Sequence, residues 1–296
     1  MVENFSILIP VYNFDVNILV SQLYKEAKKL TNNFEIILID DKSEPEFIKI
    51  NKYLQGKKKI FFHFLDKNIG RAKIRNLLFE KAQYENCLIL DCDVQIIKEK
   101  FLENYFSNLD NNVVVGGHEY TEEAPKDSEK YFHWLYGSKV EVQNIKTRVK
   151  NPYASFMTNS FATTKTIFNK IKFNEFITEY GHEDTLFGLA LKKKNISIKH
   201  ILNPVLHLGL VNEKEFYFKQ EKAIENLTKL YLKEEYKKEL SNIKLIKFYN
   251  SPLKYTLGFI KFYSKFSPKD KSKLINFSLW KLEKFNFYMK KKLVGV

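Results

Sequence analysis

The sequence predicts an α/β fold: a mixed sheet flanked by helices, followed by a C-terminal helical extension. Two observations carry this prediction. The first hundred residues contain short apolar runs without polar alternation, which are typical of parallel strands buried on both faces. Segments with helical apolar spacing separate these runs, in the order of elements that α/β proteins show. Beyond about residue 112 this alternation becomes irregular, and from Asn212 onward only helices are expected.

Four strands and two helices are expected in the first half of the chain. Each strand is an apolar run that ends beside polar residues, and each helix repeats apolar residues every three or four positions. The first strand is expected to stop at Pro10, because proline cannot donate to a sheet ladder. The expected strands are Phe5–Asn13, Glu35–Asp41, Lys59–Leu65 and Leu88–Val94, and the expected helices are Val16–Leu30 and Gly70–Ala82.

The second half adds further strands and helices. Residues 1–211 are expected to form one domain and residues 212–296 a basic helical extension. The expected elements are a strand Val113–Tyr120, a helix around Tyr131–Val140, a helix from Gly181–Asp184 to about Lys194, a short strand Ile196–Ile201 and a short apolar segment Pro204–His207.

The composition favours a globular protein of a reducing compartment. At 296 residues the chain can bury a substantial core. Its two cysteines, Cys87 and Cys92, fall in one expected strand and would face opposite sides, so no disulfide framework is expected. No signal peptide and no run of 18 uncharged apolar residues is recognised. We therefore expect a cytoplasmic location.

The formal charge of +14 is concentrated in the C-terminal tail. Residues 241–296 hold 13 lysines against only Asp270 and Glu283, and they are rich in aromatic residues. A basic segment with this aromatic content favours an anionic membrane surface as its partner, with peripheral binding at the inner face of the cell membrane. A helical cap on the preceding domain is the alternative. Nucleic acid is not expected as a partner.

Polar residues gather where the expected strands end. Because open α/β sheets bind ligands at the carboxyl ends of their strands, these residues are candidates for one site. Asp91 and Asp93, which would share one face of an extended strand, suit a metal-bound diphosphate. The alternative for this pair is a strand that runs into an acidic turn. The other candidates at strand ends are Tyr12, Asn13, Asp40, Asp41 and the segment Asn68–Arg71.

Three further features match the needs of a nucleotide-sugar donor and an acceptor hydroxyl. Gly70 and Arg71 would open a helix, where backbone N–H groups and the helix dipole favour phosphate. Glu183 and Asp184 would also open a helix, either as capping residues or as a general base with a neighbour that orients substrate. His207 can join Asp93 in a mixed oxygen and nitrogen site for an ion such as Mn²⁺, although a single histidine is more often structural.

Taken in order, these segments resemble the family 2 glycosyltransferases of the GT-A fold. The resemblance covers residues 4 to about 210, and its later part is similar to galactosyltransferase-like and chondroitin-polymerase-like relatives. Lys42 departs from the pattern, because a small residue is usual there. The motifs are Ser6-Ile-Leu-Ile-Pro-Val-Tyr-Asn13, Ile39-Asp-Asp-Lys-Ser43, Asn68-Ile-Gly-Arg71, Leu90-Asp-Cys-Asp93 and Gly181-His-Glu-Asp184 followed by His207.

The resemblance implies an inverting transfer of a sugar from a nucleotide-sugar donor, usually a UDP-sugar, to a hydroxyl of a glycan or lipid-linked acceptor, with Mn²⁺ or Mg²⁺. It also implies a nucleotide-binding half at 1–110 and an acceptor-binding half at 111–211. Asp184 would be the general base and Glu183 a contact to a hydroxyl. Asp93 and His207 would bind the metal. The implied donor-binding residues are Pro10, Tyr12, Asp40, Asp41, Gly70, Arg71 and Asp91.

Two other functions compete with this reading. A nucleotidyltransferase would share the sheet and the carboxylates, but it needs an early glycine-rich loop, and residues 6–20 contain no glycine. A non-catalytic protein that binds nucleic acid or membrane through its basic tail is the second alternative. Its binding would depend on salt and on the tail, and it would not depend on Asp93.

Overall fold

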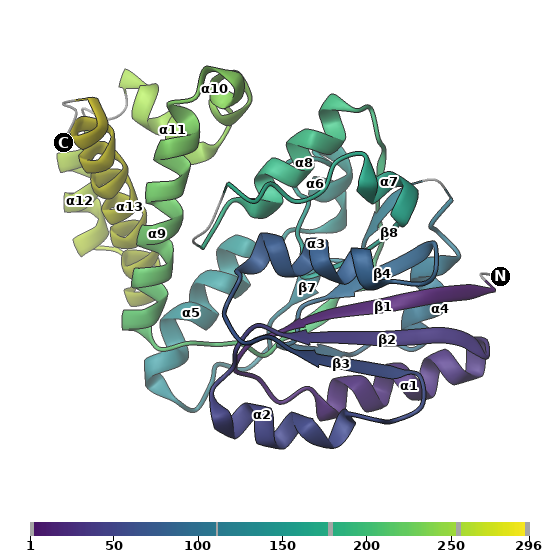
Figure 1. The fold of residues 1–296 in the computed structure, drawn as a ribbon. Coiled ribbons are helices and arrows are strands. Elements are labelled where there is room, and N and C mark those ends of the chain that lie inside the picture. The colour runs from purple at the N-terminus through teal and green to yellow at the C-terminus, as the bar shows by residue number, and fades with distance from the viewer. Residues whose placement is uncertain (1–2, 111, 177–179, 253–255, 294–296) are drawn as a thin grey trace. The chain divides into compact units, whose positions relative to one another are not determined.

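The computed structural model describes residues 3–110, 112–176, 180–252 and 256–293 (Figure 1). The chain divides into two compact units. The first contains Met1–Ala124, Gly137–Thr178 and Glu183–Leu210, and the second contains Pro125–Tyr136, Glu179–His182 and Val211–Val296. Every residue that the sequence predicts to bind the donor, bind the metal or act in catalysis belongs to the first unit.

A mixed seven-stranded sheet forms the centre of the first unit, in the order β3-β2-β1-β4-β8-β6-β9. Its first four strands pair in parallel, whereas β8 is antiparallel to both β4 and β6. A second sheet has the order β5-β10-β7. The strands are β1 (Asn4–Val11), β2 (Asn33–Asp40), β3 (Ile60–Phe64), β4 (Asn86–Leu90), β5 (Val94–Ile96), β6 (Val113–Val115), β7 (His118–Glu119), β8 (Ser160–Thr164), β9 (Ile198–His200) and β10 (Val205–His207).

Helices cover both faces of the large sheet, and Figure 1 shows α1 and α3 on opposite sides of β1, β2 and β3. Successive residues of β1 alternate between two cores: Ile7 and Ile9 pack with α1 and α4, whereas Leu8 packs with α3, α7 and α8. Burial on both faces explains the continuous apolar runs. The helices of this unit are α1 (Asn17–Leu30), α2 (Pro45–Asn51), η1 (Lys52–Leu54), α3 (Arg71–Lys81), α4 (Phe101–Phe106), a π-helical segment Gly137–Glu141, α6 (Ile145–Lys150), α7 (Lys165–Asn169) and α8 (Glu183–Lys193).

The first strand continues through Pro10 to Val11, so the predicted stop at Pro10 is wrong. Val11 accepts a hydrogen bond from Asp41 N–H on the β2 side, so the backbone of Pro10 faces the β4 side. On that side β4 pairs only with Ser6–Leu8. The N–H that proline lacks therefore has no ladder partner to lose at this position.

The strand predicted over Leu88–Val94 is also wrong in its extent. β4 ends at Leu90, the next three residues form a turn, and β5 begins at Val94. Asp91 and Asp93 therefore do not share a face of one strand, and Cys92 does not lie in the strand that holds Cys87. The ladder ends here because Leu90 is the last residue of β4 that pairs with β8.

The strand predicted over Val113–Tyr120 is divided by two glycines into β6 and β7. A Cβ atom on Gly116 would lie 2.1 Å from the hydroxyl of Tyr105, and Gly117 has a φ of +92°. Only glycine is tolerated at such a close approach and readily adopts such a φ angle. The pair redirects the chain from the large sheet to the small one.

The second unit consists of helices around an aromatic cluster. Phe132 and Tyr136 of α5 pack with Phe216 of α9 and Phe277 of α13, so Tyr136 belongs to this core. Within the parts of the chain that the structure describes, no helix combines the length and the apolarity needed to cross a bilayer. Lys254 of the basic tail lies outside the described residues. The helices are η2 (Ser128–Lys130), α5 (Tyr131–Tyr136), α9 (Glu213–Tyr231), α10 (Glu234–Leu240), α11 (Lys244–Asn250), α12 (Leu257–Lys265) and α13 (Lys269–Leu293).

Candidate active site

The carboxyl ends of β1 and β2 bring two predicted donor-binding segments together. Val11 lies opposite Asp40 in the parallel register, so Tyr12 and Asp41 follow at the same edge of the sheet. Tyr12 is 52% exposed, and its ring is therefore accessible to a ligand. Pro10 lies within β1 just before this edge.

Asp41 connects the end of β2 to the start of α3. Its two carboxylate oxygens accept hydrogen bonds from the N–H groups of Ile69, at 2.6 Å, and Gly70, at 3.0 Å. Burial raises the pKa of Asp41, while these two hydrogen bonds oppose the rise. The amide of Asn68 also donates to the Asp41 carbonyl. Asp41 thus holds the loop that places Gly70 and Arg71 at the helix N-terminus.

Gly70 occupies the N-cap position of α3 with φ +85° and ψ +164°. This conformation is essentially restricted to glycine, which gives a local reason for the residue type. Arg71 is the first residue of the helix, and its side chain is 52% exposed. The structure therefore leaves part of the Arg71 guanidinium accessible beside the end of β2.

Asp40 is fully buried and closes a turn. One of its carboxylate oxygens accepts a hydrogen bond from Ser43 N–H at 2.7 Å, and the other has no hydrogen-bond partner among the described residues. Lys42, between them, has φ +67°, a backbone conformation that is uncommon for residues other than glycine. The turn role of Asp40 is what the structure shows, and its contact with a nucleotide stays a prediction.

Arg75 joins the end of β4 to the start of α8. Its guanidinium is almost fully buried and lies 2.6 Å from the carboxylate of Asp91 and 3.9 Å from that of Glu183. Arg71 approaches the same Glu183 oxygen at 3.4 Å. The sequence did not single out Arg75. Arg75 lies four residues after Arg71 and therefore on the same face of the expected helix. That spacing could have identified it as a second basic residue of the site.

Asp184 is the predicted general base, and its surroundings favour the neutral carboxyl form. Burial raises the pKa of Asp184 to about 7, and the negative charge of Glu183 adds to the rise. A hydrogen bond from Thr185 N–H and the charges of Arg75 and Arg71 oppose it. A carboxyl group with a pKa near neutrality is well suited to accept a proton at physiological pH.

The loop before α8 depends on a glycine. Gly181 has φ +103°, and a Cβ atom there would lie 2.6 Å from the Cβ of Ala223 in α9. His182 follows with φ +71°. The motif Gly181–Asp184 therefore combines a backbone that needs glycine with two carboxylates that open a helix, where the dipole stabilises them.

Asp93 and His207 lie together, as predicted for a metal site. Pairing of β5 with β10 places His207 opposite Val94, and His207 Nδ1 lies 3.9 Å from Asp93 Oδ2. A Cβ atom on Gly209 would lie only 2.0 Å from this oxygen, so the glycine leaves the carboxylate its space. Within the described residues no group of three or more His, Cys, Asp or Glu side chains could hold a metal ion.

These two side chains fit a divalent ion that also binds other ligands. Ligands at about 2.1 Å from one ion lie about 3 Å apart when adjacent and about 4 Å apart when opposite. The separation of 3.9 Å between Asp93 and His207 falls within that range. A carboxylate and an imidazole suit Mn²⁺, and a diphosphate and water would have to complete the coordination.

The sequence matches a known family over more than half of the chain. Residues 6–171 match the profile described as Glycosyl transferase family 2. An uncharacterized glycosyltransferase of Haemophilus influenzae is 28% identical over 221 residues, which cover 72% of this chain and 83% of that protein. An uncharacterized glycosyltransferase of Rickettsia bellii is 31% identical over 114 residues, which cover 38% of this chain and 16% of that protein.

Solved structures show the same fold. TarS 1–349 of S. aureus is 16% identical with a TM-score of 0.51, and the match covers 99% of this chain and 92% of that one. The same fragment in complex with UDP is 17% identical with a TM-score of 0.50. Family membership favours sugar transfer over the nucleotidyltransferase and non-catalytic alternatives. The chain belongs to glycosyl transferase family 2 and is a glycosyltransferase with the GT-A fold.

Proposed function

We propose that the protein transfers a sugar from a UDP-sugar to a hydroxyl of a glycan or lipid-linked acceptor, with inversion and with Mn²⁺ or Mg²⁺. The observation that carries this proposal is the Arg75 bridge between Asp91, on the metal side, and Glu183, beside the base. This bridge connects the side of the site that would hold the metal with the residue next to the proposed base, and a single displacement needs both the metal and the base. The complex of TarS with UDP supports a UDP-linked donor.

The donor would bind along the carboxyl ends of β1, β2 and β4. Tyr12 is exposed there, and Gly70 and Arg71 open α3 at the same edge, where a helix N-terminus favours phosphate. Asp91, held by Arg75, would contact the ribose or a water bound to the metal. The residues proposed to hold the nucleotide are Pro10, Tyr12, Asp40, Asp41, Gly70, Arg71 and Asp91.

The proposed reaction is a single displacement. Asp184 accepts the proton of the acceptor hydroxyl, and the oxygen forms a bond to the anomeric carbon from the face opposite UDP. The bond from that carbon to the phosphate oxygen breaks, and its electron pair leaves with UDP. Asp93 and His207 would hold the cation that neutralises the charge growing on UDP. Glu183, fixed by the two arginines, would orient a substrate hydroxyl.

A donor screen that follows UDP release with and without Mn²⁺ tests this function directly. We expect release from at least one UDP-sugar, dependent on the metal. Asp93→Ala should abolish turnover and weaken Mn²⁺-dependent UDP binding, whereas Asp184→Asn should abolish turnover and leave that binding intact. Asp66→Asn, at an exposed aspartate, is the matched control. Undiminished turnover of Asp184→Asn would disprove the assignment of the base.

The C-terminal helices are proposed to bind an anionic membrane surface, as a peripheral contact at the inner face of the cell membrane. Phe259, Phe262 and Phe266 are 73%, 58% and 74% exposed on or next to α12. Their spacing of three and four residues puts them on one side of the helix. Lys261 and Lys265 are exposed among them. Exposed aromatic rings with lysines are typical of helices that lie in the membrane interface.

Other lysines of the tail stabilise the helical unit itself. Lys281 donates a hydrogen bond to the hydroxyl of Tyr136, and Lys284 forms an ion pair with Glu221 at 2.6 Å. These contacts are what a purely structural role of the basic residues would predict. The exposed rings of α12 support the membrane proposal, because they contribute little to the unit's own core.

Sedimentation with vesicles tests the membrane proposal. We expect the protein to sediment with phosphatidylglycerol vesicles, and much less with phosphatidylcholine vesicles, because the tail is basic. Replacing Phe259, Phe262 and Phe266 together by serine should release it. The control is Phe218→Ser, at a phenylalanine of α9 that is 62% exposed. Equal binding of the triple variant and the control would exclude the α12 face.

A further inference from the structure

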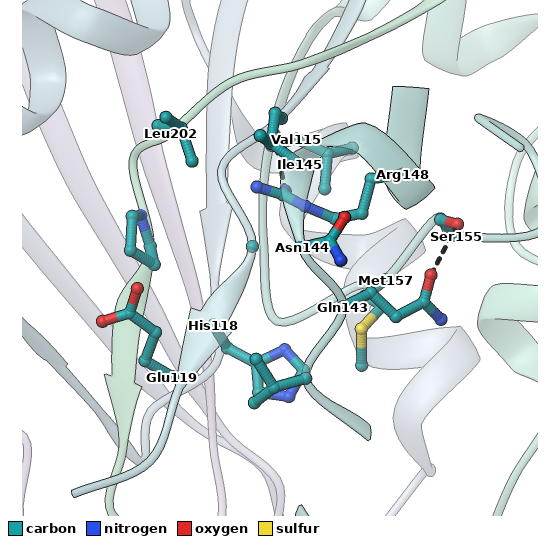
Figure 2. Close-up of a pocket in the computed structure, with 13 residues that line it drawn as sticks. Val115, His118, Glu119, Gln143, Asn144, Ile145, Arg148, Ser155, Met157 and Leu202 are labelled. Atoms are coloured by element: carbon teal, nitrogen blue, oxygen red, sulfur yellow. Dashed lines mark hydrogen bonds between the residues drawn. The ribbon is translucent and has the colours of Figure 1, made fainter. Parts of the chain in front are cut away.

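A cavity of about 220 Å³ lies beside the ends of β6 and β7 (Figure 2). Its volume is more than ten times that needed for one water molecule, so it can hold a group of the size of a sugar residue. Its wall is largely apolar, and the polar side chains in it are His118, Glu119, Gln143, Asn144, Arg148 and Ser155. None of these residues was predicted from the sequence to take part in the site.

The cavity lies on the same sheet edge as the donor site but on the other side of β4. Because β8 is antiparallel to both β4 and β6, these two strands run in the same direction. The end of β6, at Val115, therefore lies at the edge where β4 ends. The proposed nucleotide residues follow β1 and β2, on one side of β4, and the cavity follows β6, on the other. The cavity and the proposed nucleotide residues therefore lie on opposite sides of β4.

Arg148 is a buried cation that forms no ion pair within the described residues, although the charge of Glu119 acts on it. Its side chain is 6% exposed, and it donates to the carbonyls of Ile201, at 2.9 Å, and Val115, at 3.5 Å. Its Nε atom has no hydrogen-bond partner among the described residues. Burial lowers the pKa of the guanidinium, and the charges of Tyr105 and Glu119 only oppose this shift, which reflects the cost of burying a charge. An anion in the cavity would offset that cost.

Gly117 makes room for this guanidinium. A Cβ atom on Gly117 would lie 2.6 Å from Nη1 of Arg148. The positive φ of Gly117 and the absence of its side chain thus allow Arg148 to reach the backbone at the end of β6. The arrangement places a positive charge at the wall of the cavity (Figure 2).

Two amides add hydrogen-bond donors to the lining of the cavity. The side-chain oxygen of Asn144 accepts from Thr147 N–H at 2.9 Å, and that of Gln143 accepts from the Ser155 hydroxyl at 2.8 Å, as Figure 2 shows. Because the protein uses both oxygens, the two amide N–H₂ groups are left to donate to a ligand. Together with Arg148, these two amides are complementary to a ligand group that carries several acceptor atoms.

A chain of aromatic contacts connects the cavity with the proposed metal site. The ring of His118, which lines the cavity, lies 5.7 Å from that of Tyr120, and Tyr120 lies 5.3 Å from His207. Burial lowers the pKa of His118 to about 4, so this residue is neutral at pH 7. The positive charge that faces a ligand in the cavity is therefore that of Arg148.

We infer that this cavity is an acceptor subsite for an anionic group, a carboxylate or a phosphate, carried by the acceptor saccharide. The inference rests on the proposed function. Asp184 does not line the cavity, so the group bound there is not the hydroxyl that reacts. Glu119 also lines the cavity and opposes an anion, and its removal should strengthen binding.

Ligand-observed NMR with three probes tests the inference in the full chain. Glucuronate and glucose 6-phosphate should bind at least tenfold more tightly than glucose, and the stronger of the two identifies the anion as carboxylate or phosphate. Arg148→Gln should weaken the anionic probe at least tenfold, as expected for a lost charge-assisted hydrogen bond. Glu119→Gln should strengthen it several-fold. Equal binding of all three probes would overturn the inference.

A second variant guards against a folding defect in Arg148→Gln. Leu202 lines the cavity and is 70% exposed, so Leu202→Trp should block the cavity without touching the guanidinium. Leu202→Trp should abolish probe binding and leave UDP release without acceptor unchanged. The control is Glu46→Gln on α2, which should leave both probe binding and UDP release unchanged. Probe binding that survives Leu202→Trp would overturn the inference. Probe binding without UDP release from any donor would instead overturn the proposed function alone.

Discussion

The guanidinium of Arg75 lies 2.6 Å from the carboxylate of Asp91, across 16 residues of sequence. Arg75 is 2% exposed, and Asp91 is 24% exposed. The other terminal nitrogen of Arg75 lies 3.9 Å from the carboxylate of Glu183, which is also buried. One buried cation therefore holds two carboxylates from two distant elements, and this places the end of β4 and the start of α8 around the proposed reaction centre.

Removing this cation should destabilise the protein. Arg75→Met is expected to lower the free energy of unfolding by about 3 kcal/mol, because it leaves Asp91 and Glu183 without their buried partner. Urea denaturation at pH 7 measures the change. Arg71→Met is the control, because Arg71 is half exposed and its ion pair contributes less than about 1 kcal/mol. Equal losses for the two variants would contradict the bridging role of Arg75.

The rate of sugar transfer should depend on the ionisation of Asp184. Because the base must be deprotonated, kcat/KM should rise with pH and reach half its maximum near pH 7, the pKa at which burial and Glu183 place Asp184. Glu183→Gln should move the midpoint to lower pH, because a neighbouring negative charge raises the pKa of a carboxyl group. If the midpoint stays or rises in Glu183→Gln, the charge of Glu183 does not raise the pKa of the catalytic base.

A side chain at position 209 should weaken metal binding by Asp93 and His207. In Gly209→Ala the added Cβ would meet Asp93 Oδ2 at 2.0 Å and displace it from His207. Displaced ligands typically cost about tenfold or more in metal affinity, so Mn²⁺-dependent UDP binding should weaken by about that factor in calorimetry. Gly258→Ala, where nothing lies within 4 Å of the added atom, should leave it unchanged. Equal affinities in the two variants would argue against the Asp93–His207 site.

The backbone at Gly70 should control donor binding. Gly70→Ala and Gly56→Ala both place alanine at a positive φ, +85° and +80°, and each should lower stability by about 1–2 kcal/mol. Of these two glycines, it is Gly70 that donates its N–H to Asp41 at the start of α3. Gly70→Ala should therefore also raise KM for the donor about tenfold, in steady-state assays of UDP release. An equal rise in Gly56→Ala would show that lost stability explains the effect.

Much of the fold was predictable because local apolar patterns record burial. The run predicted over Glu35–Asp41 is β2, Asn33–Asp40, and the helix predicted over Gly70–Ala82 is α3, Arg71–Lys81. The errors fall where an apolar run continues past the end of its ladder, as at Asp91, or where the chain changes sheets, as at Gly116. A local pattern does not record where a pairing partner ends.

The sequence by itself determined that the chain is an α/β protein and that polar residues such as Asp41 and Asp91 follow buried strands, because apolar runs and strand ends are local properties. Only the tertiary structure decided which charges meet. Arg71 and Glu183 are 112 residues apart and come together on two helices. The raised pKa of Asp184 and the buried charge of Arg148 beside its cavity likewise arise from desolvation. Desolvation depends on every element packed around a group, which no single stretch of sequence specifies.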